Sequence, residues 1–494
     1  MADEDLQQPQ VPADRPRIGV DEWVAREEEL RLDQGLLGPV RRFFATVPWW
    51  WLLLGAAVGG ILIGAFVNDE YFLQVGLDTL TYVLLALDLN VVAGWAGLLD
   101  LGYVLFLGVG AYGFAWLSSD HFDIHWTAFA SVPVVMAGTA IVGLLIGLTS
   151  WRLLGDYLAI VTLFMLQIFI TFGNNGDTIN LPFVDGPVNL TNGANGIHPI
   201  DSFDLVVWQA ETVKDYYFLA LGIALILLAG LYLLNESRTG RAWRALREDP
   251  LAANVLSMPV NRLKLLAFVF GATIGGLTGT VFAASQNAVF PADFNLQKLI
   301  LIYAMVILGG AGSLPGVVIG AIVINVSDRL LTTPENARLI FYGGIIIALL
   351  SLLPRRRWGP VWVGGIAAGT LVFGFAVRAV VGALWPDGVD GTLPGEGWLT
   401  NALSHWVLVP TDPYDISRYA YVLLIALVVS LTFIHGVWRR LLVAPLIYLA
   451  ACVWENLLVA EPATTRLILL GALLVALMNL RPEGLFGTAR VEVV

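Results

Sequence analysis

The sequence predicts an all-α, polytopic helical membrane protein with roughly 14 spans and with its N- and C-termini inside. Of the 494 residues, 57% are hydrophobic and only 13% are charged, about half the charged share of a soluble globular protein. Runs of about 20 apolar residues, enough to cross a hydrocarbon core of roughly 30 Å as helix, recur along the chain. Stretches such as 216–234 and 339–353 are almost continuously apolar, whereas a transmembrane barrel needs alternating apolar and polar residues.

The distribution of charge between the predicted spans sets their orientation. Threading the spans alternately from a cytoplasmic N-terminus places every arginine-rich loop inside, as the positive-inside rule requires. The acidic loops at 118–123, 174–214, 285–294 and 385–398 then face outside. Two of the spans, 298–310 and 315–331, are short enough to form a broken or re-entrant pair. The predicted spans are 48–67, 72–92, 100–118, 127–149, 154–173, 216–234, 263–284, 298–310, 315–331, 338–353, 360–385, 419–436, 440–459 and 464–480.

Several classes of chemistry lack the residues that they need. The chain contains no Walker A glycine-lysine loop, so we do not expect it to be an ATPase itself. It also lacks HExxH, CxxC and paired-histidine patterns, which leaves metal chemistry and hydrolysis without candidates. The single cysteine, Cys452, excludes an internal disulfide. The net charge of −12 says little, because the acids lie mostly in the N-terminal tail and a few loops. We therefore expect neither an enzyme, nor a metal site, nor a nucleic-acid partner.

The segment RTGRAWRALREDPLAANVLSMP, at 238–259, concentrates arginine in a chain that is poor in charge. Its spacing predicts a short amphipathic helix at the inner membrane surface. Asp249 can cap a second short helix with Pro250 at its first position, where a missing N–H costs nothing. A basic loop held by anionic lipid would explain the composition, but not the cap, the proline stop and the spaced alanines. Arg241, Arg244, Arg247 and Glu248 share one arc of the first helix, and Ala242, Trp243 and Leu246 occupy another.

One internal repeat is visible in the C-terminal half. The stretch 334–354 aligns without gaps to 462–482, with Arg338 matching Arg466 and with prolines at both ends. Leucine-rich helices align easily by chance, so a partial duplication and a coincidence both stay open. A real duplication would make the C-terminal part an elaborated copy of a terminal helix.

Several stretches resemble one family in the family's own order. They are LDLNVVAGWAGLLDLGYVLFLGVGAY (87–112), GDYLAIVTL (155–163) with GNN (173–175) and NGI (195–197), the segment 240–284, VILGGAGSLPGVVIGA (306–321) and the terminal NLRPEGLFG (479–487). On these residues the chain resembles the LivM-type permease, a membrane subunit of ABC importers for branched-chain amino acids.

The resemblance implies an ABC importer permease fold in which the loop 235–262 couples to a separate ATPase. It implies two ABC ATPase subunits that use ATP and Mg, a homologous permease of the LivH type, and an external substrate-binding protein. This chain itself would carry no cofactor. Carried over to this sequence, the ATPase-coupling residues are Arg241, Ala242, Ala245, Arg247, Glu248, Asp249 and Ala252.

Polar groups at membrane depth and glycine-rich runs are the candidates for the substrate path. Ionisable or polar residues inside spans are functional candidates, although Asp100 and Asp156 lie near predicted helix ends and could simply cap helices. Glycines in apolar helices permit close packing or a helix break that frees backbone groups. By resemblance, the asparagines of the outer loop lie near the substrate entrance. The path candidates are Asn90, Gly94, Asp100, Asp156, Asn174, Asn175, Asn195 and Gly196, and the packing or break candidates are Gly309, Gly310, Gly312 and Gly316.

The predicted organisation has four parts: a cytoplasmic tail (1–47), a permease core (48–353), an additional transmembrane insertion (354–465) that departs from the family pattern, and a terminal helix with a cytoplasmic tail (466–494). The expected function is translocation of branched-chain or other aliphatic amino acids, in the cell inner (plasma) membrane. Two alternatives stay open: an ion-coupled secondary transporter of small polar solutes, and an ABC permease for urea or short amides. The exact substrate and the purpose of the insertion stay open too, as does whether the permease pair consists of identical or different chains.

Overall fold

The computed structural model describes most of the chain between its two ends. The described residues are 47–150, 156–180, 186–205, 208–351, 359–386, 389–395, 397–411, 413–433, 437–460, 465–468, 470–472, 475 and 484–486. Almost all of the predicted N-terminal tail (1–47), and most of the predicted terminal helix and tail (466–494), lie outside these residues.

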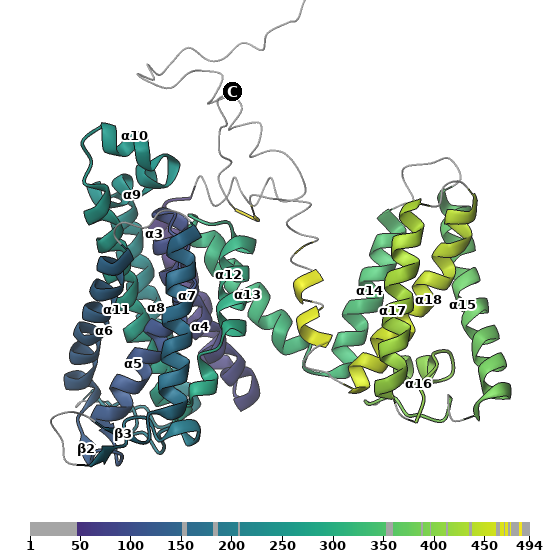
Figure 1. Cartoon of the computed structure of the whole chain (residues 1–494), viewed down its shortest axis with the longest axis horizontal. Coiled ribbons are helices and arrows are strands. Elements are labelled where there is room, and N and C mark those ends of the chain that lie inside the picture. Colours follow the sequence, from purple (N-terminus) through teal and green to yellow (C-terminus); the bar gives the residue numbers. More distant parts are fainter. Residues whose placement is uncertain are drawn as a thin grey trace, which may run out of the picture.

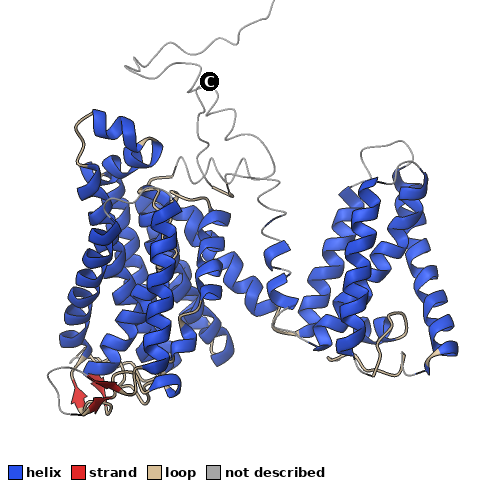
Figure 2. Ribbon diagram, in the orientation of Figure 1, coloured by secondary structure: helices blue, strands red, loops and turns tan. Residues whose placement is uncertain are grey.

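The described part is all-α apart from two short strand pairs, as predicted (Figure 2). The main helices are α3 (Trp49–Phe66), α4 (Glu70–Leu89), α5 (Val104–Leu117), α6 (Ala128–Ser150), α7 (Asp156–Asn175), α8 (Val213–Glu236), α9 (Arg238–Glu248), α10 (Pro250–Val255), α11 (Val260–Gln286), α12 (Leu296–Gly309), α13 (Leu314–Leu330), α14 (Pro334–Ser351), α15 (Gly359–Leu384), α16 (Trp398–Ser404), α17 (Pro413–Phe433) and α18 (Val437–Ala460). Short helical turns are the π-helix η1 (Asn90–Trp95) and the 3-10 turns η2 (Gly193–Asn195) and η3 (Pro291–Asp293). The strands β1 (Ser118–Ser119) and β2 (Ile124–His125), and β3 (Ile179–Asn180) and β4 (Pro187–Val188), pair antiparallel.

The helices form two units (Figure 1). We call α3 to α13 the core and α14 to α18 the C-terminal unit. The chain passes between them at α13 and α14, which meet at 117°. A small apolar cluster joins the units, with Leu331 and Ala337 from the junction packed against Trp454 and Leu458 of α18. The C-terminal unit contains most of the predicted insertion (354–465) and also α14, which the sequence analysis assigned to the predicted core (48–353).

In the centre of the core, α11 packs between α5 and α6, and glycines bring their backbones together. A Cβ atom at Gly110 of α5 would lie 2.4 Å from the carbonyl oxygen of Gly276. A Cβ atom at Gly279 would lie 2.3 Å from the carbonyl oxygen of Leu107. Such small-residue interfaces are typical of helices that associate in lipid, where close packing replaces the hydrophobic effect as the driving force.

Membrane-spanning helices account for most of the described chain. Nine described helices are long and apolar enough to cross a bilayer, or up to ten if the bent pair α13 and α14 counts as one span. The polytopic helical class is confirmed, whereas the number of roughly 14 crossings stays a prediction. The predicted pair 298–310 and 315–331 corresponds to α12 and α13, which pack against each other on either side of a glycine-rich turn.

The two ends of the core differ in the way that the predicted orientation requires. The arginine-rich helix α9 and the short α10 lie at one end, and both strand pairs lie at the other (Figure 1). At the strand end, the loops predicted to face outside contact one another, because Ile197 and Val289 form a β-bridge. We refer to these as the inner and outer ends.

In the C-terminal unit, a fully buried ion pair joins α14 to α18. Nε of Arg338 lies 2.7 Å from Oε2 of Glu455, and both side chains are completely buried. The arginine also donates to Thr400 Oγ1 at 2.9 Å. Arg466, which aligns with Arg338 in the sequence repeat, forms a different ion pair. Its Nε lies 3.0 Å from Oδ1 of Asp328 of α13. The two aligned arginines thus bind carboxylates in different units.

Candidate functional site

The coupling segment predicted from the sequence forms two short helices at the inner end of the core (Figure 1). The Ser237 hydroxyl accepts from the N–H of Gly240 and caps α9. The Asp249 carboxylate accepts from the N–H groups of Leu251 and Ala252 at 2.8 and 3.1 Å, and Pro250 is in the first turn. The predicted cap is therefore confirmed, and it fixes the sharp turn between α9 and α10.

One face of α9 anchors it to the core. Trp243 and Leu246 are fully buried, and the indole N–H of Trp243 donates to the carbonyl of Leu263 at 2.9 Å. This bond ties α9 to the first turn of α11. Because a buried indole contributes both a large apolar surface and a fixed donor, α9 is held as a rigid part of the core.

The opposite face is open at the inner end. The tip formed by α10 also exposes large apolar side chains, Leu251, Val255 and Leu256, at 75% to 84% of their full area. A contiguous apolar tip of this kind is typical of a protein contact, and the sequence analysis did not single it out. Of the predicted coupling residues, Arg241, Ala245, Glu248, Asp249 and Ala252 are exposed, and Ala242 is half-buried.

Arg247 differs from the other predicted coupling residues, because its guanidinium reaches into the core. Nη1 donates to the carbonyl of Gly94 at 2.5 Å and to the carbonyl of Ala311 at 3.2 Å. These carbonyls belong to two elements that are far apart in sequence, the π-helix η1 and the turn between α12 and α13. An arginine suits this position because its planar fork carries several donors in a fixed geometry.

The same two elements are also bonded to each other. Oδ1 of Asn90 accepts from the N–H of Gly312 at 2.7 Å, and the indole N–H of Trp95 donates to the carbonyl of Gly312 at 3.0 Å. Gly312 has φ +96°, a conformation that favours glycine. We call Asn90, Gly94, Trp95, Arg247 and Gly312 the coupling junction, since it joins α9 to two interrupted helices.

Each interruption exposes backbone groups that a regular helix would use internally. The π-helix lengthens the hydrogen-bond ladder at the end of α4, and π-bulges of this kind occur frequently at functional sites. Gly310 ends α12. Gly309 and Gly316 pack the hairpin, since a Cβ atom at Gly309 would lie 2.3 Å from the carbonyl oxygen of Gly316. The four predicted glycines thus divide into a packing pair, Gly309 and Gly316, and a turn pair, Gly310 and Gly312.

Two buried carboxylates lie near the junction. Asp100 accepts from the N–H of Gly102 at 2.8 Å within the turn before α5. It is not the cap of that helix, because the N-cap of α5 is Tyr103. Asp88, near the end of α4 and two residues before Asn90, accepts a 2.6 Å hydrogen bond from the hydroxyl of Tyr103. Asp156 is the first residue of α7, and its side chain lies outside the described part.

The remaining path candidates lie at the outer end, away from the junction. Asn174 and Asn175 donate back to carbonyls of their own helix, α7, and their residues are exposed. Asn195 is exposed in η2. A Cβ atom at Gly196 would lie 2.3 Å from the carbonyl oxygen of Val289, so this glycine permits close packing of two outer loops. The structure therefore divides the predicted path residues between two ends.

Within the described ranges, no group of three or more His, Cys, Asp or Glu side chains could hold a metal ion.

Comparison with known proteins identifies the family. The family model for the permease component of branched-chain amino acid transport systems matches residues 71–350. LivM, a high-affinity branched-chain amino acid transport system permease protein of Escherichia coli, is 33% identical over 320 residues, which cover 59% of this chain and 72% of LivM. The LivH permease protein of Salmonella typhimurium is 24% identical over 303 residues, covering 57% of this chain and 93% of LivH. No solved structure matches significantly.

The matched region contains both helix interruptions, the coupling segment and the outer loops, and ends within α14. The described helices are those of a multi-pass protein of the inner membrane. The chain therefore belongs to the family of permease components of branched-chain amino acid transport systems.

Proposed function

We propose that this chain is the permease subunit of an ABC importer that moves branched-chain or other aliphatic amino acids into the cell. An external binding protein delivers the amino acid, and a homologous permease of the LivH type completes the path. Two separate ATPase subunits, which use ATP and Mg, drive the cycle. The observation that carries this proposal is the coupling junction, in which one arginine of α9 holds both interrupted helices.

The proposed mechanism begins at the exposed face of α9 and α10. Arg241 and Glu248 can form charge-assisted contacts with an ATPase cleft, and the apolar tip of α10 can fill it. When the ATPases close, α9 moves with them, because its caps and Trp243 make it stiff. Arg247 then transmits that displacement to η1 and to the turn between α12 and α13.

Both interrupted helices are suited to respond. A bistable element is needed to turn a small displacement into a change of access, and a helix break supplies one because its backbone groups can exchange partners. Asn90 and Trp95 hold the two breaks together, so they move as one body. The path would open inward when this body shifts away from the central helix α11.

The first experiment tests the source of energy. The chain, a homologous permease and candidate ATPases are reconstituted in liposomes with the binding protein, and uptake of labelled leucine is measured. We expect uptake only when ATP is supplied on the side of the ATPases. Uptake that follows an imposed proton or sodium gradient without ATPases would contradict the proposal and favour the secondary transporter. Equal uptake of urea in competition with leucine would favour the short-amide permease instead.

A second experiment tests the coupling segment. Deletion of residues 249–253 removes the Asp249 cap and most of α10, so we expect loss of ATP-driven uptake with unchanged membrane insertion. The matched control is Glu211→Cys, in the exposed loop before α8 at the outer end, which should transport normally. Full transport by the deletion variant would refute the assignment of the coupling segment.

A further inference from the structure

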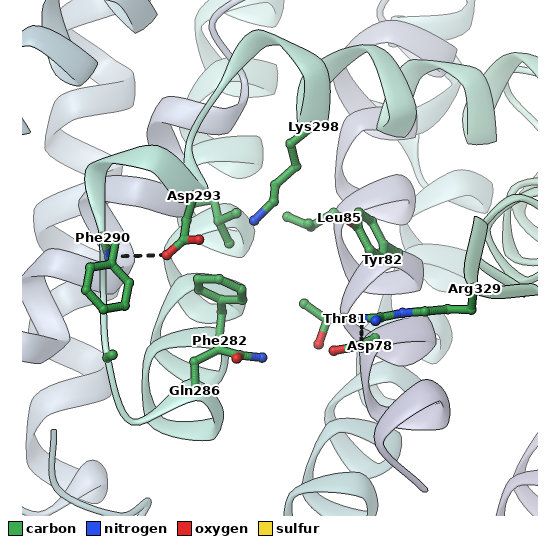
Figure 3. A pocket seen from close by; sticks show the side chains of 12 residues that line it. Asp78, Thr81, Tyr82, Leu85, Phe282, Gln286, Phe290, Asp293, Lys298 and Arg329 are labelled. Atoms are coloured by element: carbon green, nitrogen blue, oxygen red, sulfur yellow. Dashed lines mark hydrogen bonds and ion pairs between the residues drawn. The ribbon is translucent and has the colours of Figure 1, made fainter. Parts of the chain in front are cut away.

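A cavity of about 300 Å³ lies near the outer end of the core, between two groups of helices (Figure 3). On one side are α4 and α13, and on the other are the end of α11, η3 and the first turns of α12. Ligand sites in proteins begin at about this size, so the cavity is suited to a small molecule. The lining residues are Asp78, Thr81, Tyr82, Leu85, Leu107, Phe282, Gln286, Ala288, Phe290, Asp293, Lys298 and Arg329.

The walls carry charges of both signs. Asp78 of α4 forms an ion pair with Arg329 of α13 and also accepts from Gln74. On the opposite wall, Oδ2 of Asp293 accepts from the N–H of Phe290 at 3.2 Å. Lys298 projects from α12 beside it (Figure 3). Charged side chains within membrane spans are rare and functional by default. Four charged side chains line this one small cavity, and three of them, Asp78, Lys298 and Arg329, belong to predicted spans.

Lys298 is the member of this set whose charge is not balanced by a direct partner. Its Nζ lies 4.5 Å from the centre of the Phe282 ring and 5.9 Å from that of Phe294. It forms no ion pair with any residue in the described part of the chain. Figure 3 shows its ammonium group pointing into the space beside Asp293 and above Phe282. The carboxylates of Asp293 and Asp78 are the nearby opposite charges, but neither is in direct contact with the ammonium. A half-buried ammonium with ring contacts and no bound carboxylate is suited to an anionic group.

We infer that this cavity binds a small aliphatic amino acid as a zwitterion. The inference rests on the proposed function and names the groups that would recognise its substrate. The substrate carboxylate pairs with the ammonium of Lys298, and the substrate ammonium pairs with the Asp293 carboxylate. One zwitterion can bind both side chains, because its ammonium and its carboxylate are bonded to the same α-carbon. Its aliphatic side chain lies against Leu85, Leu107 and Phe282.

The position of the cavity agrees with this assignment. It opens among the outer ends of α4, α11 and α13, on the side from which a binding protein would deliver substrate. The coupling junction lies on α4 as well, since η1 directly continues that helix. A substrate in the cavity therefore contacts the same helix that the coupling arginine holds at its inner end.

The test uses cysteine protection in the full chain. Cys452 is buried and is the single cysteine of the sequence, so Cys452→Ala gives a cysteine-free background. In that background, Gln286→Cys places a thiol on the cavity wall, and Glu211→Cys places one on the outer surface as a control. The chain is studied with its partner permease in lipid nanodiscs, without binding protein or ATPases. The rate of modification by a small charged methanethiosulfonate reagent is measured.

We expect leucine to slow modification of Gln286→Cys severalfold and to leave Glu211→Cys unchanged. Leucinamide, which lacks the carboxylate, and 4-methylpentanoate, which lacks the ammonium, should not protect. Lys298→Gln should raise the leucine concentration needed for protection by about tenfold or more, since a charge-assisted bond is lost. Lys298→Arg, which keeps the positive charge, should restore part of the affinity for leucine. The matched control is Lys264→Gln, at the inner end of α11. In this variant leucine should protect the Gln286→Cys thiol at the same concentration as in the parent.

Three outcomes would overturn the inference. Equal protection by 4-methylpentanoate would show an anion site, absence of protection by leucine would show no amino acid site, and unchanged protection in Lys298→Gln would show that this lysine is not the anchor. A lipid headgroup as the partner of Lys298 would appear as protection that depends on anionic lipid in the nanodisc and not on leucine. If the reconstituted importer takes up leucine with ATP while protection fails, this inference fails and the proposed function stands.

Discussion

The core and the C-terminal unit are both helical and apolar, but they are held together in different ways. In the core, glycines let helix backbones touch, as at Gly110 and Gly276. In the C-terminal unit, Gly343, Gly364 and Gly365 face open space, and Gly374 meets the side chains of Trp406 and Tyr448. The buried pair Arg338 and Glu455 joins α14 to α18 there. The comparison indicates that the core is stabilised by close contacts between helix backbones, whereas the C-terminal unit is stabilised mainly by contacts between side chains.

The family match follows the same division. It ends at residue 350, within α14, so α15 to α18 lie beyond it. The insertion has its own apolar cluster around Trp406, Val407 and Tyr448.

The largest effect is expected from removing the buried ion pair of the C-terminal unit. Glu455→Ala leaves the Arg338 guanidinium buried without its carboxylate, which costs about 3–5 kcal/mol. We expect the C-terminal unit to become sensitive to limited proteolysis in detergent while the core stays resistant. Arg338→Met combined with Glu455→Leu should recover most of the resistance, because no charge is left unpaired. If the C-terminal unit of Glu455→Ala resists proteolysis as well as that of the parent, the ion pair does not stabilise this unit and the contrast with the core is wrong.

The next effect concerns the coupling junction of the core. Arg247→Glu replaces two charge-assisted hydrogen bonds to carbonyls with repulsion, so ATP-driven uptake should fall by about a hundredfold. Hydrolysis of ATP by the assembled complex should continue, which separates coupling from assembly. Arg247→Lys keeps the charge without the planar fork and should retain intermediate uptake. Normal uptake by Arg247→Glu, measured beside ATP hydrolysis in the same liposomes, would remove the junction from the mechanism.

A matched pair of glycine substitutions sharpens the packing contrast. Gly110→Ala places a Cβ atom 2.4 Å from the carbonyl oxygen of Gly276, and such overpacking costs about 1–3 kcal/mol. Gly343→Ala meets nothing within 4 Å and should be neutral or stabilising by about 0.5–1 kcal/mol, because alanine favours helix. Thermal unfolding of both variants in detergent measures the difference. Equal shifts would mean that the glycines do not distinguish the two units.

The smallest effect is a pH dependence confined to the outer loops of the core. The Asp201 carboxylate, 2.7 Å from Nδ1 of His125, raises the pKa of that imidazole, with Asp120 and Asp123 adding to it. A raised pKa in the folded state stabilises the loop fully below the ordinary histidine pKa of about 6.5. This stabilisation is lost as pH rises through the raised value.

Hydrogen exchange of the loops around β1 and β2, followed from below pH 6.5 upward, measures this effect. Exchange, corrected for its intrinsic pH dependence, should become faster as His125 loses its proton. In His125→Gln the dependence should vanish. The amides around the buried pair Arg338 and Glu455, which contains no histidine, should show none in either protein. A pH dependence that persists in His125→Gln would assign it to another group.

The sequence by itself determined the helical membrane class and the apolar segments that form the long helices, and it predicted which loops share an end of the core. Apolar runs and arginine placement are local properties of the chain, so they survive without knowledge of the fold. The Asp249 cap and the turn at Pro250 were also predictable, because capping depends on residues within one helical turn.

Only the tertiary structure decided which residues meet. Arg247 looked like its exposed neighbours on a helical wheel, yet it bonds Gly94 and Ala311, which lie 153 and 64 residues away. The cavity around Lys298 joins helices α4, α11, α12 and α13, and no spacing rule connects Asp78 with Arg329. The reason is physical: helix formation follows from neighbours in sequence, whereas a junction or a cavity depends on how separate helices pack.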